Sequence, residues 1–321
     1  MKNKILEILK NTDGYVSGES ISEQLSLSRS MVWKYINKLR NDGYIINSVT
    51  NKGYKLDFCP DIISAEEIMQ KLSNQLIGGN VIYTSETDST NNMAKRNSDC
   101  AEGSVFIADI QTAGKGRLGR SWKSSAGNGI YMSVLIKPDI SPEKISQITL
   151  VAGISVCMAL REYGADAFIK WPNDIVAGGK KICGILNELS AEQERINYVV
   201  CGIGINVHDK SFHEEISDKA TSLYLSTGKS FARSDIIVSV LQYFEKYYKM
   251  YTGGETGKIL SDYKSLCITL DKDVQIIKDG KALTAKALDI DSDGALMVLS
   301  EGKHMRVMSG EVSVRGILGY C

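Results

Sequence analysis

Residues 111–122 read QTAGKGRLGRSW, a run in which three glycines alternate with three cations before an indole. Glycine lets backbone N–H groups approach a ligand closely, and Lys and Arg supply charge for a carboxylate or a phosphate. The apolar run 104–110 before it indicates a strand, so we expect the loop at a sheet edge, where small-ligand sites are often built. It matches neither a P-loop nor a dinucleotide-binding turn, because 128–136 reads as another strand. A flexible surface loop is the plainer alternative.

Composition excludes several classes of protein. The chain has 321 residues, zero formal net charge and 43% hydrophobic residues, as expected of a globular protein of two or three domains rather than of a membrane or generally basic protein. The longest apolar stretch, 148–160, is too short to span a bilayer and predicts a buried helix. Seven scattered cysteines without a C-x-x-C pair indicate a reducing, cytoplasmic compartment. Three histidines without metal-ligand spacing give no reason to expect zinc.

Residues 1–60 predict a winged helix-turn-helix domain. Three amphipathic helices are followed by a hairpin pattern at 44–56, and Ser28 is in position to cap the third helix. The stretch 1–58 carries nine Lys/Arg and six Asp/Glu, so 9 − 6 = +3 on a neutral chain. A set of outward-facing residues is therefore predicted to contact DNA: Arg29, Ser30, Trp33, Lys34, Asn37 and, in the hairpin turn, Lys52. A winged helix kept for protein contact alone is the alternative.

The remaining chain predicts two further domains, which makes the whole a multidomain α+β protein. Residues 65–266 mix strands and helices, and successive strands without intervening helices favour a mixed or antiparallel sheet. The strands are expected at 81–84, 104–111, 129–136, 167–170, 181–188 and 196–205, and the helices at 65–77, 89–98, 143–163 and 233–250. Residues 267–321 show only short strands and tight turns, which predicts a small β-barrel.

Four more segments carry polar or glycine-rich patterns that could serve the same site as the loop. Residues 87–92 (TDSTNN) open a helix with hydroxyls and amides, although simple helix capping explains them equally well. Residues 170–174 (KWPND) bring a lysine, an aromatic ring to stack on, an amide and a carboxylate to one strand end, or form a charged turn. In 178–186 strand alternation sends two neighbouring lysines to opposite faces, and at least one of them is expected in solvent. The glycines of 202–207 (GIGINV) weaken a buried strand and indicate close approach of a ligand.

No catalytic triad or carboxylate pair stands out. The residue types instead indicate electrostatic catalysis, in which N–H groups and cations surround an anion that gains charge in the transition state.

These motifs, in this order, with a terminal GEVSVRG at 310–316, resemble the bifunctional biotin–protein ligases that are also biotin operon repressors. The resemblance covers nearly the whole chain. It implies a central catalytic domain like that of class II aminoacyl-tRNA synthetases and a C-terminal SH3-like barrel. It also implies a reaction with ATP and Mg²⁺, in which biotin becomes biotinyl-5′-AMP and is then transferred to a lysine of a biotin carboxyl carrier protein, in acetyl-CoA carboxylase or another biotin enzyme.

The resemblance also assigns residues. Biotin would be bound by Ser89, Thr90, Asn91, Gln111, Gly114, Lys115, Gly116, Arg117, Lys181, Gly184 and Gly204. The nucleotide would be bound by Arg120, Trp122, Asn173, Asp174, Asn206 and Arg315. Lys181 and Arg117 would be catalytic, and Asp174 would bind Mg²⁺. Lys115 and Leu118 depart from common family choices, since Lys cannot make a bidentate fork and Leu118 removes a cation that some relatives carry.

The resemblance further implies a homodimer when biotinyl-AMP is bound, operator DNA as a partner, and no membrane association. Two alternatives remain open from sequence: a lipoate-type protein ligase, and a transcription factor that senses an effector without catalysis.

Overall fold

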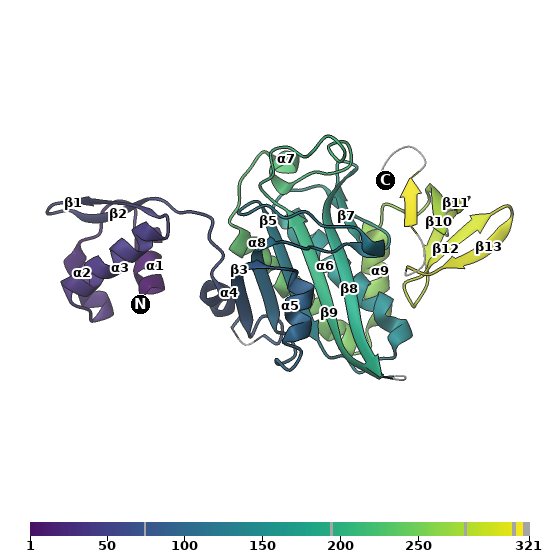
Figure 1. The fold of residues 1–321 in the computed structure, drawn as a ribbon, viewed down its shortest axis with the longest axis horizontal. Coiled ribbons are helices and arrows are strands. Elements are labelled where there is room, and N and C mark those ends of the chain that lie inside the picture. The colour runs from purple at the N-terminus through teal and green to yellow at the C-terminus, as the bar shows by residue number, and fades with distance from the viewer. Residues whose placement is uncertain (74, 193–194, 279–280, 310–312, 317–321) are drawn as a thin grey trace. The chain divides into compact units, whose positions relative to one another are not determined.

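The computed structural model describes residues 1–73, 75–192, 195–278, 281–309 and 313–316 (Figure 1). The chain divides into two compact units, Met1–Ile62 and Ile63–Cys321. Each has its own hydrophobic core.

The first unit is the predicted winged helix. Its elements are α1 (Lys2–Lys10), α2 (Gly18–Leu25), α3 (Arg29–Asn41), β1 (Ile45–Val49) and β2 (Gly53–Phe58). The Ser28 hydroxyl accepts a hydrogen bond from the Met31 N–H at 3.3 Å, which confirms the predicted cap of α3. Gly53 has a φ of +103°, and a Cβ there would lie 2.0 Å from the Val16 carbonyl oxygen, so only glycine lets the wing pair with the segment between α1 and α2.

The second unit is built on a seven-stranded mixed sheet in the order β3-β4-β5-β9-β8-β7-β6. Its strands are β3 (Val81–Thr87), β4 (Val105–Gln111), β5 (Gly129–Ile136), β6 (Ala167–Lys170), β7 (Asp174–Ala177), β8 (Lys180–Glu192) and β9 (Arg195–Asn206). Neighbouring strands pair antiparallel except β3 and β4, which are parallel. The predicted mixed sheet is therefore confirmed.

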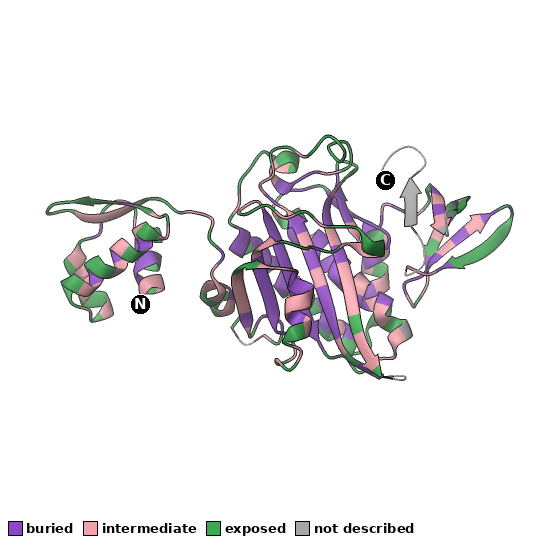
Figure 2. Ribbon diagram, viewed as in Figure 1, coloured by how far each residue is buried: buried purple, intermediate pink, exposed green. Residues whose placement is uncertain are grey.

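Helices cover both faces of this sheet (Figure 1). One face packs on α4 (Ala65–Lys71), α6 (Ile145–Glu162), α8 (Arg233–Thr252) and α9 (Thr256–Leu266). The other face packs on α5 (Thr90–Arg96) through a smaller cluster that includes Ala94, Phe106 and Leu135. Figure 2 shows that the strands between these layers are largely buried. Helix α6 is long and apolar enough to cross a membrane, but 72% of it is buried inside this unit.

Two expectations for the helices need correction. The helix predicted over 65–77 ends at Lys71, because Glu245 on α8 accepts hydrogen bonds from the N–H groups of Leu76 (3.2 Å) and Ile77 (2.8 Å) and holds that segment as a loop. Helix α9, strand β7 and the short helix α7 (Leu223–Thr227) were not predicted. Their apolar patterns are too brief to show a period.

The C-terminal strands form a five-stranded antiparallel sheet in the order β13-β12-β11-β10-β14, as expected of an all-β part. They are β10 (Asp273–Lys278), β11 (Lys281–Ile290), β12 (Leu296–Ser300), β13 (Lys303–Val307) and β14 (Ser313–Gly316). This sheet is attached to the part of the chain that carries the mixed sheet by one buried and one exposed hydrogen bond. The Trp171 indole N–H donates to the Gly294 carbonyl oxygen at 3.0 Å, and the Gln147 amide donates to the Ser292 carbonyl oxygen at 2.8 Å.

Candidate active site

A cavity of about 610 Å³ opens on the α5 side of the mixed sheet. Residues from all five polar or glycine-rich segments line it, at 89–91, 111–122, 170–174, 181–186 and 202–204. These segments are far apart in the chain, and the antiparallel pairing of β7, β8 and β9 brings three of them together. Charged, polar and apolar residues all line it, which suits a ligand with charged and apolar parts.

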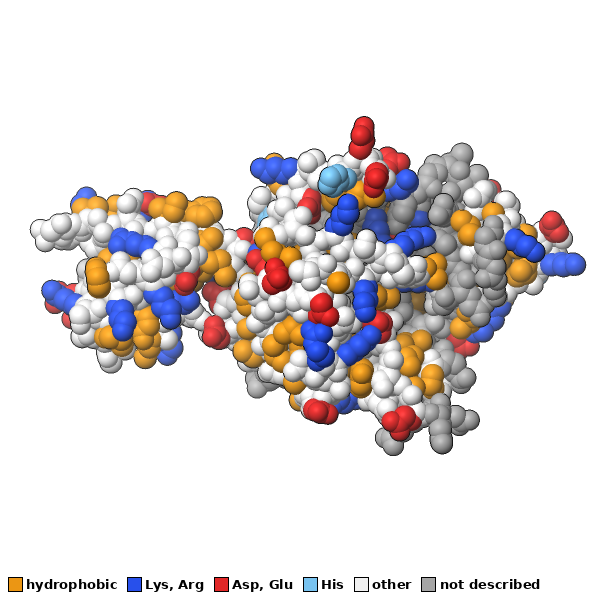
Figure 3. All heavy atoms as spheres, viewed as in Figure 1, with side chains coloured by type: hydrophobic (Ala, Val, Ile, Leu, Met, Phe, Trp, Pro, Cys, Tyr) orange, Lys and Arg blue, Asp and Glu red, His pale blue; other side chains and the backbone are white. Residues whose placement is uncertain are grey.

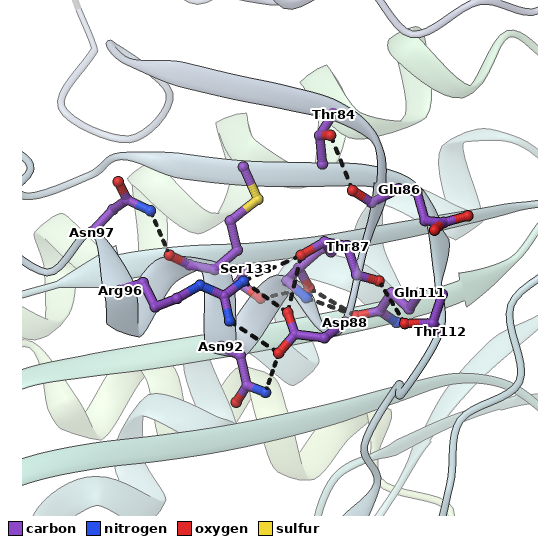
Figure 4. A network of polar contacts seen from close by, with 12 residues as sticks. Thr84, Glu86, Thr87, Asp88, Asn92, Arg96, Asn97, Gln111, Thr112 and Ser133 are labelled. Carbon is purple, nitrogen blue, oxygen red and sulfur yellow. Dashed lines mark hydrogen bonds and ion pairs between the residues drawn. The ribbon is translucent and has the colours of Figure 1, made fainter.

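The polar end of the cavity, at residues 89–91, lies at the start of α5. Figure 4 shows the network of polar contacts around this helix start. The Gln111 side-chain oxygen accepts hydrogen bonds from the Thr90 N–H at 2.9 Å and from the Thr90 hydroxyl at 3.2 Å. Asp88, one residue before the helix cap, contacts both Arg96 and Asn92 at 2.7 Å. The Arg96 guanidinium holds the pKa of the Asp88 carboxyl well below its ordinary value. Asp88 therefore anchors the helix start as a permanent anion.

The floor of the cavity is a pair of glycines that face each other across β8 and β9. A Cβ on Gly204 would lie 2.8 Å from the Trp122 ring, and one on Gly184 would lie 2.9 Å from it. A Cβ on Gly202 would lie 2.2 Å from the side-chain oxygen of Asn91. The strand glycines thus make room for an indole and a buried amide, and the close approach expected at 202–207 is made by protein groups in this structure.

The glycine–cation loop folds back on itself beside the floor. The Gly116 N–H donates to the Arg120 carbonyl oxygen at 2.7 Å, and the Trp122 N–H donates to the Gly114 carbonyl oxygen at 2.9 Å. The Arg117 guanidinium turns inward, where it donates to the side-chain oxygen of Asn173 at 3.0 Å and to the Ser309 carbonyl oxygen. Burial lowers the pKa of Arg117 from its ordinary value, but Arg remains a cation at any physiological pH.

A second cation, Lys181, lines the same cavity. The Lys181 ammonium lies 2.5 Å from the Asp174 carboxylate and 5.5 Å from the centre of the Trp122 ring. Its neighbour Lys180 is exposed and donates to the Ser217 carbonyl oxygen at 2.9 Å. Because neighbouring side chains of a strand point to opposite faces, Lys181 lines the cavity and Lys180 lies in solvent.

Most predicted ligand residues line the cavity, but Gly114 and Asn206 do not. Gly114 is buried beneath the loop, and Asn206 donates to the Thr221 carbonyl oxygen at 3.0 Å. Arg315 lies on β14, but its side chain is outside the described part of the chain.

The interpretation of Trp171 as a ring for stacking is wrong. This side chain is 1% exposed and belongs to the core, held by its bond to Gly294. Trp122 is the indole in the cavity. Three further lining residues were not predicted, because none stands in a distinctive local pattern: Asp218, Lys219 and Gln275.

Within the described residues no group of three His, Cys, Asp or Glu side chains could hold a metal ion by itself. Asp174 is one carboxylate in the cavity wall. Mg²⁺ commonly binds through one or two carboxylates together with phosphates of the substrate, so one carboxylate fits an ion that arrives with a nucleotide.

In the winged-helix unit, the residues predicted to contact DNA lie along the outer side of α3 and at the turn of the wing. Arg29, Ser30, Trp33 and Lys34 are exposed, and Asn37 is half-buried. Lys52 is exposed in the turn between β1 and β2. Figure 3 shows Lys and Arg side chains distributed over this unit, with fewer acidic side chains. Surface cations of this kind suit phosphate contacts.

Known protein families match the winged helix, the mixed-sheet domain and the C-terminal sheet. Residues 82–206 match the biotin/lipoate A/B protein ligase family, 2–55 match an HTH domain and 269–315 match the biotin protein ligase C-terminal domain. The chain is 35% identical over 320 residues to the bifunctional ligase/repressor BirA of Bacillus subtilis, with 98% of each chain covered. It is 30% identical over 314 residues to that of Escherichia coli, with 97% of this chain and 96% of that one covered. The structure is similar to a biotin protein ligase from Aquifex aeolicus in complex with biotin and ATP, with a TM-score of 0.66 and 33% identity over 74% of this chain and 99% of that one.

Proposed function

The chain belongs to the family of bifunctional biotin ligase/repressors. We therefore propose that biotin is joined to AMP in its cavity and that its winged helix binds DNA. The protein is an ATP-dependent biotin–protein ligase and a transcriptional repressor. One observation supports the assignment of the chemistry to this cavity: a polar end, a glycine floor and two inward cations meet in one space large enough for a small acid and a nucleotide.

The reaction has two steps. A biotin carboxylate oxygen attacks the α-phosphorus of ATP, the bond from that phosphorus to the bridging oxygen breaks, and pyrophosphate leaves. The amine of a carrier lysine then attacks the carbonyl carbon of biotinyl-5′-AMP. The new C–N bond forms as AMP leaves, and the amine loses a proton. Charge grows on the α-phosphate in the first step and on the carbonyl oxygen in the second.

We assign Lys181 and Arg117 to this charge. Both are fixed inside the cavity by partners, Lys181 by Asp174 and Arg117 by Asn173, so little reorganisation is required when charge develops. Asp174 would contribute to holding Mg²⁺ with the phosphates, and the ion would neutralise charge on the leaving pyrophosphate. Trp122, Arg120 and Asn173 would serve the nucleotide.

The ring system of biotin would lie at the polar end, against Ser89, Thr90 and Gln111. These residues offer hydrogen bonds to a ureido group, which lipoate lacks. The winged helix and the C-terminal sheet likewise favour a biotin ligase over a lipoate ligase. A purely effector-sensing protein would have no need of Lys181 aimed into the cavity.

Incubation of the purified chain with ATP, Mg²⁺ and biotin, with and without a biotin carboxyl carrier domain, tests the ligase. We expect biotin-dependent pyrophosphate release without the carrier, and an increase in carrier mass by one biotinyl group when it is present. Lipoate in place of biotin is the comparison. Modification of the carrier by lipoate but not by biotin would overturn the substrate assignment.

We further propose that biotinyl-5′-AMP promotes a homodimer that binds a two-fold operator in biotin synthesis genes, so that repression responds to biotin. The proposal includes a division of the chain into a DNA-binding domain (1–60), a catalytic domain (65–266) and a C-terminal domain (267–321). It also includes a cytoplasmic location. Gel-shift titration on operator DNA with biotin and ATP together, against each alone, tests the regulation. An equal shift in all three conditions would contradict it.

A further inference from the structure

The guanidinium of Arg117 is held from two sides. One terminal nitrogen donates to the side-chain oxygen of Asn173 at 3.0 Å, and the other donates to the Ser309 carbonyl oxygen. A guanidinium is planar, so two contacts through different nitrogens fix both its position and the rotation of its plane. The direction in which Arg117 presents its remaining N–H groups therefore depends on how firmly Asn173 and Ser309 are themselves held.

The contact with Asn173 is anchored to the mixed sheet. The Asn173 side-chain nitrogen donates to the Ile185 carbonyl oxygen at 2.7 Å, and the Asn173 carbonyl oxygen accepts from the Ile185 N–H at 2.9 Å. Ile185 lies on β8 and is 2% exposed. One side of Arg117 thus rests on a buried strand.

The contact with Ser309 is anchored to α6. Ser309 lies in the connection between β13 and β14, and its hydroxyl is 3.2 Å from the hydroxyl of Ser146, in the first turn of α6. Ser146 is 7% exposed, and the turn at Gly294 packs on it, since a Cβ on Gly294 would lie 3.4 Å from the Ser146 Cβ. Leaving a buried hydroxyl without a partner is costly, so the contact holds the segment around Ser309 against the start of α6.

Another serine of α6 shows the ordinary alternative for a buried hydroxyl in a helix. Ser155 is 0% exposed and donates to the Val151 carbonyl oxygen at 2.7 Å, one turn earlier in the same helix. Ser146 instead contacts a residue 163 positions away, and the carbonyl oxygen of that residue accepts from Arg117. The hydroxyl of Ser146 therefore links α6 to the arginine of the cavity.

We infer that Ser146 is a positioning residue for adenylate formation, which through Ser309 orients Arg117 toward the charge that develops on the α-phosphate. The inference rests on the proposed function, in which Arg117 faces that charge. Ser146 acts only through other residues, since it is not among those that line the cavity. Orientation matters because displacement of a reacting group by about 1 Å can slow a reaction on the order of 10²-fold.

A double-mutant cycle on the full-length protein tests this coupling. The rate of biotinyl-5′-AMP formation is measured in a single turnover with saturating ATP, Mg²⁺ and biotin, for the wild type, Ser146→Ala, Arg117→Ala and the double variant. We expect Ser146→Ala to slow the wild-type reaction by about five- to tenfold, because Arg117 follows a segment that is no longer fixed. In the Arg117→Ala background the same change should have little effect, because the group that Ser146 positions is gone.

Two further variants separate positioning from attachment of the C-terminal sheet. Gln147→Ala is the matched control, because Gln147 also contacts this sheet but does so at Ser292, in the turn between β11 and β12. It should leave the rate nearly unchanged. Ser309→Ala removes the other hydroxyl of the pair and keeps the carbonyl oxygen that Arg117 contacts, so it should slow the reaction as much as Ser146→Ala does.

The outcomes distinguish this inference from the proposed function. If the wild type forms no biotinyl-5′-AMP, the proposed function fails and the inference with it. If the wild type is active, the role of Ser146 alone is refuted by equal slowing in both backgrounds, by equal slowing in Gln147→Ala, or by no slowing at all. Should Ser146→Ala not fold, the same cycle with Ser309→Ala decides, since Ser309 is only half-buried.

Discussion

Replacement of Lys181 by Ala should slow formation of biotinyl-5′-AMP by about 10²–10³-fold while the free energy of unfolding changes by about 1 kcal/mol or less. The two magnitudes differ because the Lys181 ammonium does different things in the two states. In the free protein it pairs with Asp174 at 2.5 Å, with 27% and 17% of the side chains exposed. Such partly hydrated pairs contribute little to stability. In the transition state Lys181 would face new charge in a confined site, where loss of one fixed donor costs on the order of 3 kcal/mol.

Lys180→Ala is the matched control, since it removes the same side chain one residue earlier. Lys180 is exposed, and its ammonium contacts only the Ser217 carbonyl oxygen among the described partners, at 2.9 Å. Adenylate formation is measured in a single turnover with saturating ATP and biotin, and stability by urea unfolding. The reasoning is refuted if the Lys181 and Lys180 variants form adenylate at rates within about threefold of each other, or if the Lys181 variant loses several kcal/mol of stability.

Three further predictions concern the glycine floor of the cavity, a buried ion pair and a buried thiol. Gly204→Ala places a methyl group 2.8 Å from the Trp122 ring, so the ring must move; biotin affinity should fall by about tenfold, measured by calorimetry. Arg233→Met should lower the free energy of unfolding in urea by about 3 kcal/mol, because Arg233 is 1% exposed and its loss leaves the Asp109 carboxylate, 2.6 Å away, without its cation. Burial raises the pKa of Cys157 to about 12, so alkylation at pH 8 should be negligible in the folded protein and should increase as pH rises toward that value, measured by peptide mass.

Each of these has a control in the same chain. Gly257→Ala, on α9, adds a methyl group to open space and should leave biotin affinity unchanged. Arg29→Met removes a guanidinium whose pair with Glu19 is 70% and 64% exposed, and stability should change little. Cys59 is exposed and should be alkylated readily at pH 8. Equal responses of a variant and its control would contradict the corresponding prediction.

Much of the fold could be predicted because its local signals are strong. Ser28 caps α3 as its position before an apolar stripe indicated, and the runs 129–136 and 167–170 are strands with the expected bounds. Helix α9 was missed because its buried residues, such as Ile259 and Tyr263, are too few to outweigh its polar positions. A segment of this kind becomes helical through its packing against α6 and β6.

The site was predicted as a set of motifs, but its geometry was not. Sequence spacing placed Trp171 and Trp122 in two plausible ligand segments, and only the packing of the C-terminal sheet decides that Trp171 turns into the core. Gln275 lines the cavity from that same sheet and belongs to none of the motifs, so no local pattern predicted it. Ser133 belongs to an otherwise largely apolar run, and only the structure shows its buried hydrogen bonds to Thr90 and Asn91.

The presence of two separate hydrophobic cores has a consequence for thermal unfolding of the protein. No apolar cluster is shared between Met1–Ile62 and the rest of the described chain, so each should melt by its own cooperative transition. A unit of that size buries proportionally less surface than its larger companion and should lose its structure first. DNA binding should therefore be lost on warming at a temperature at which ligase activity persists.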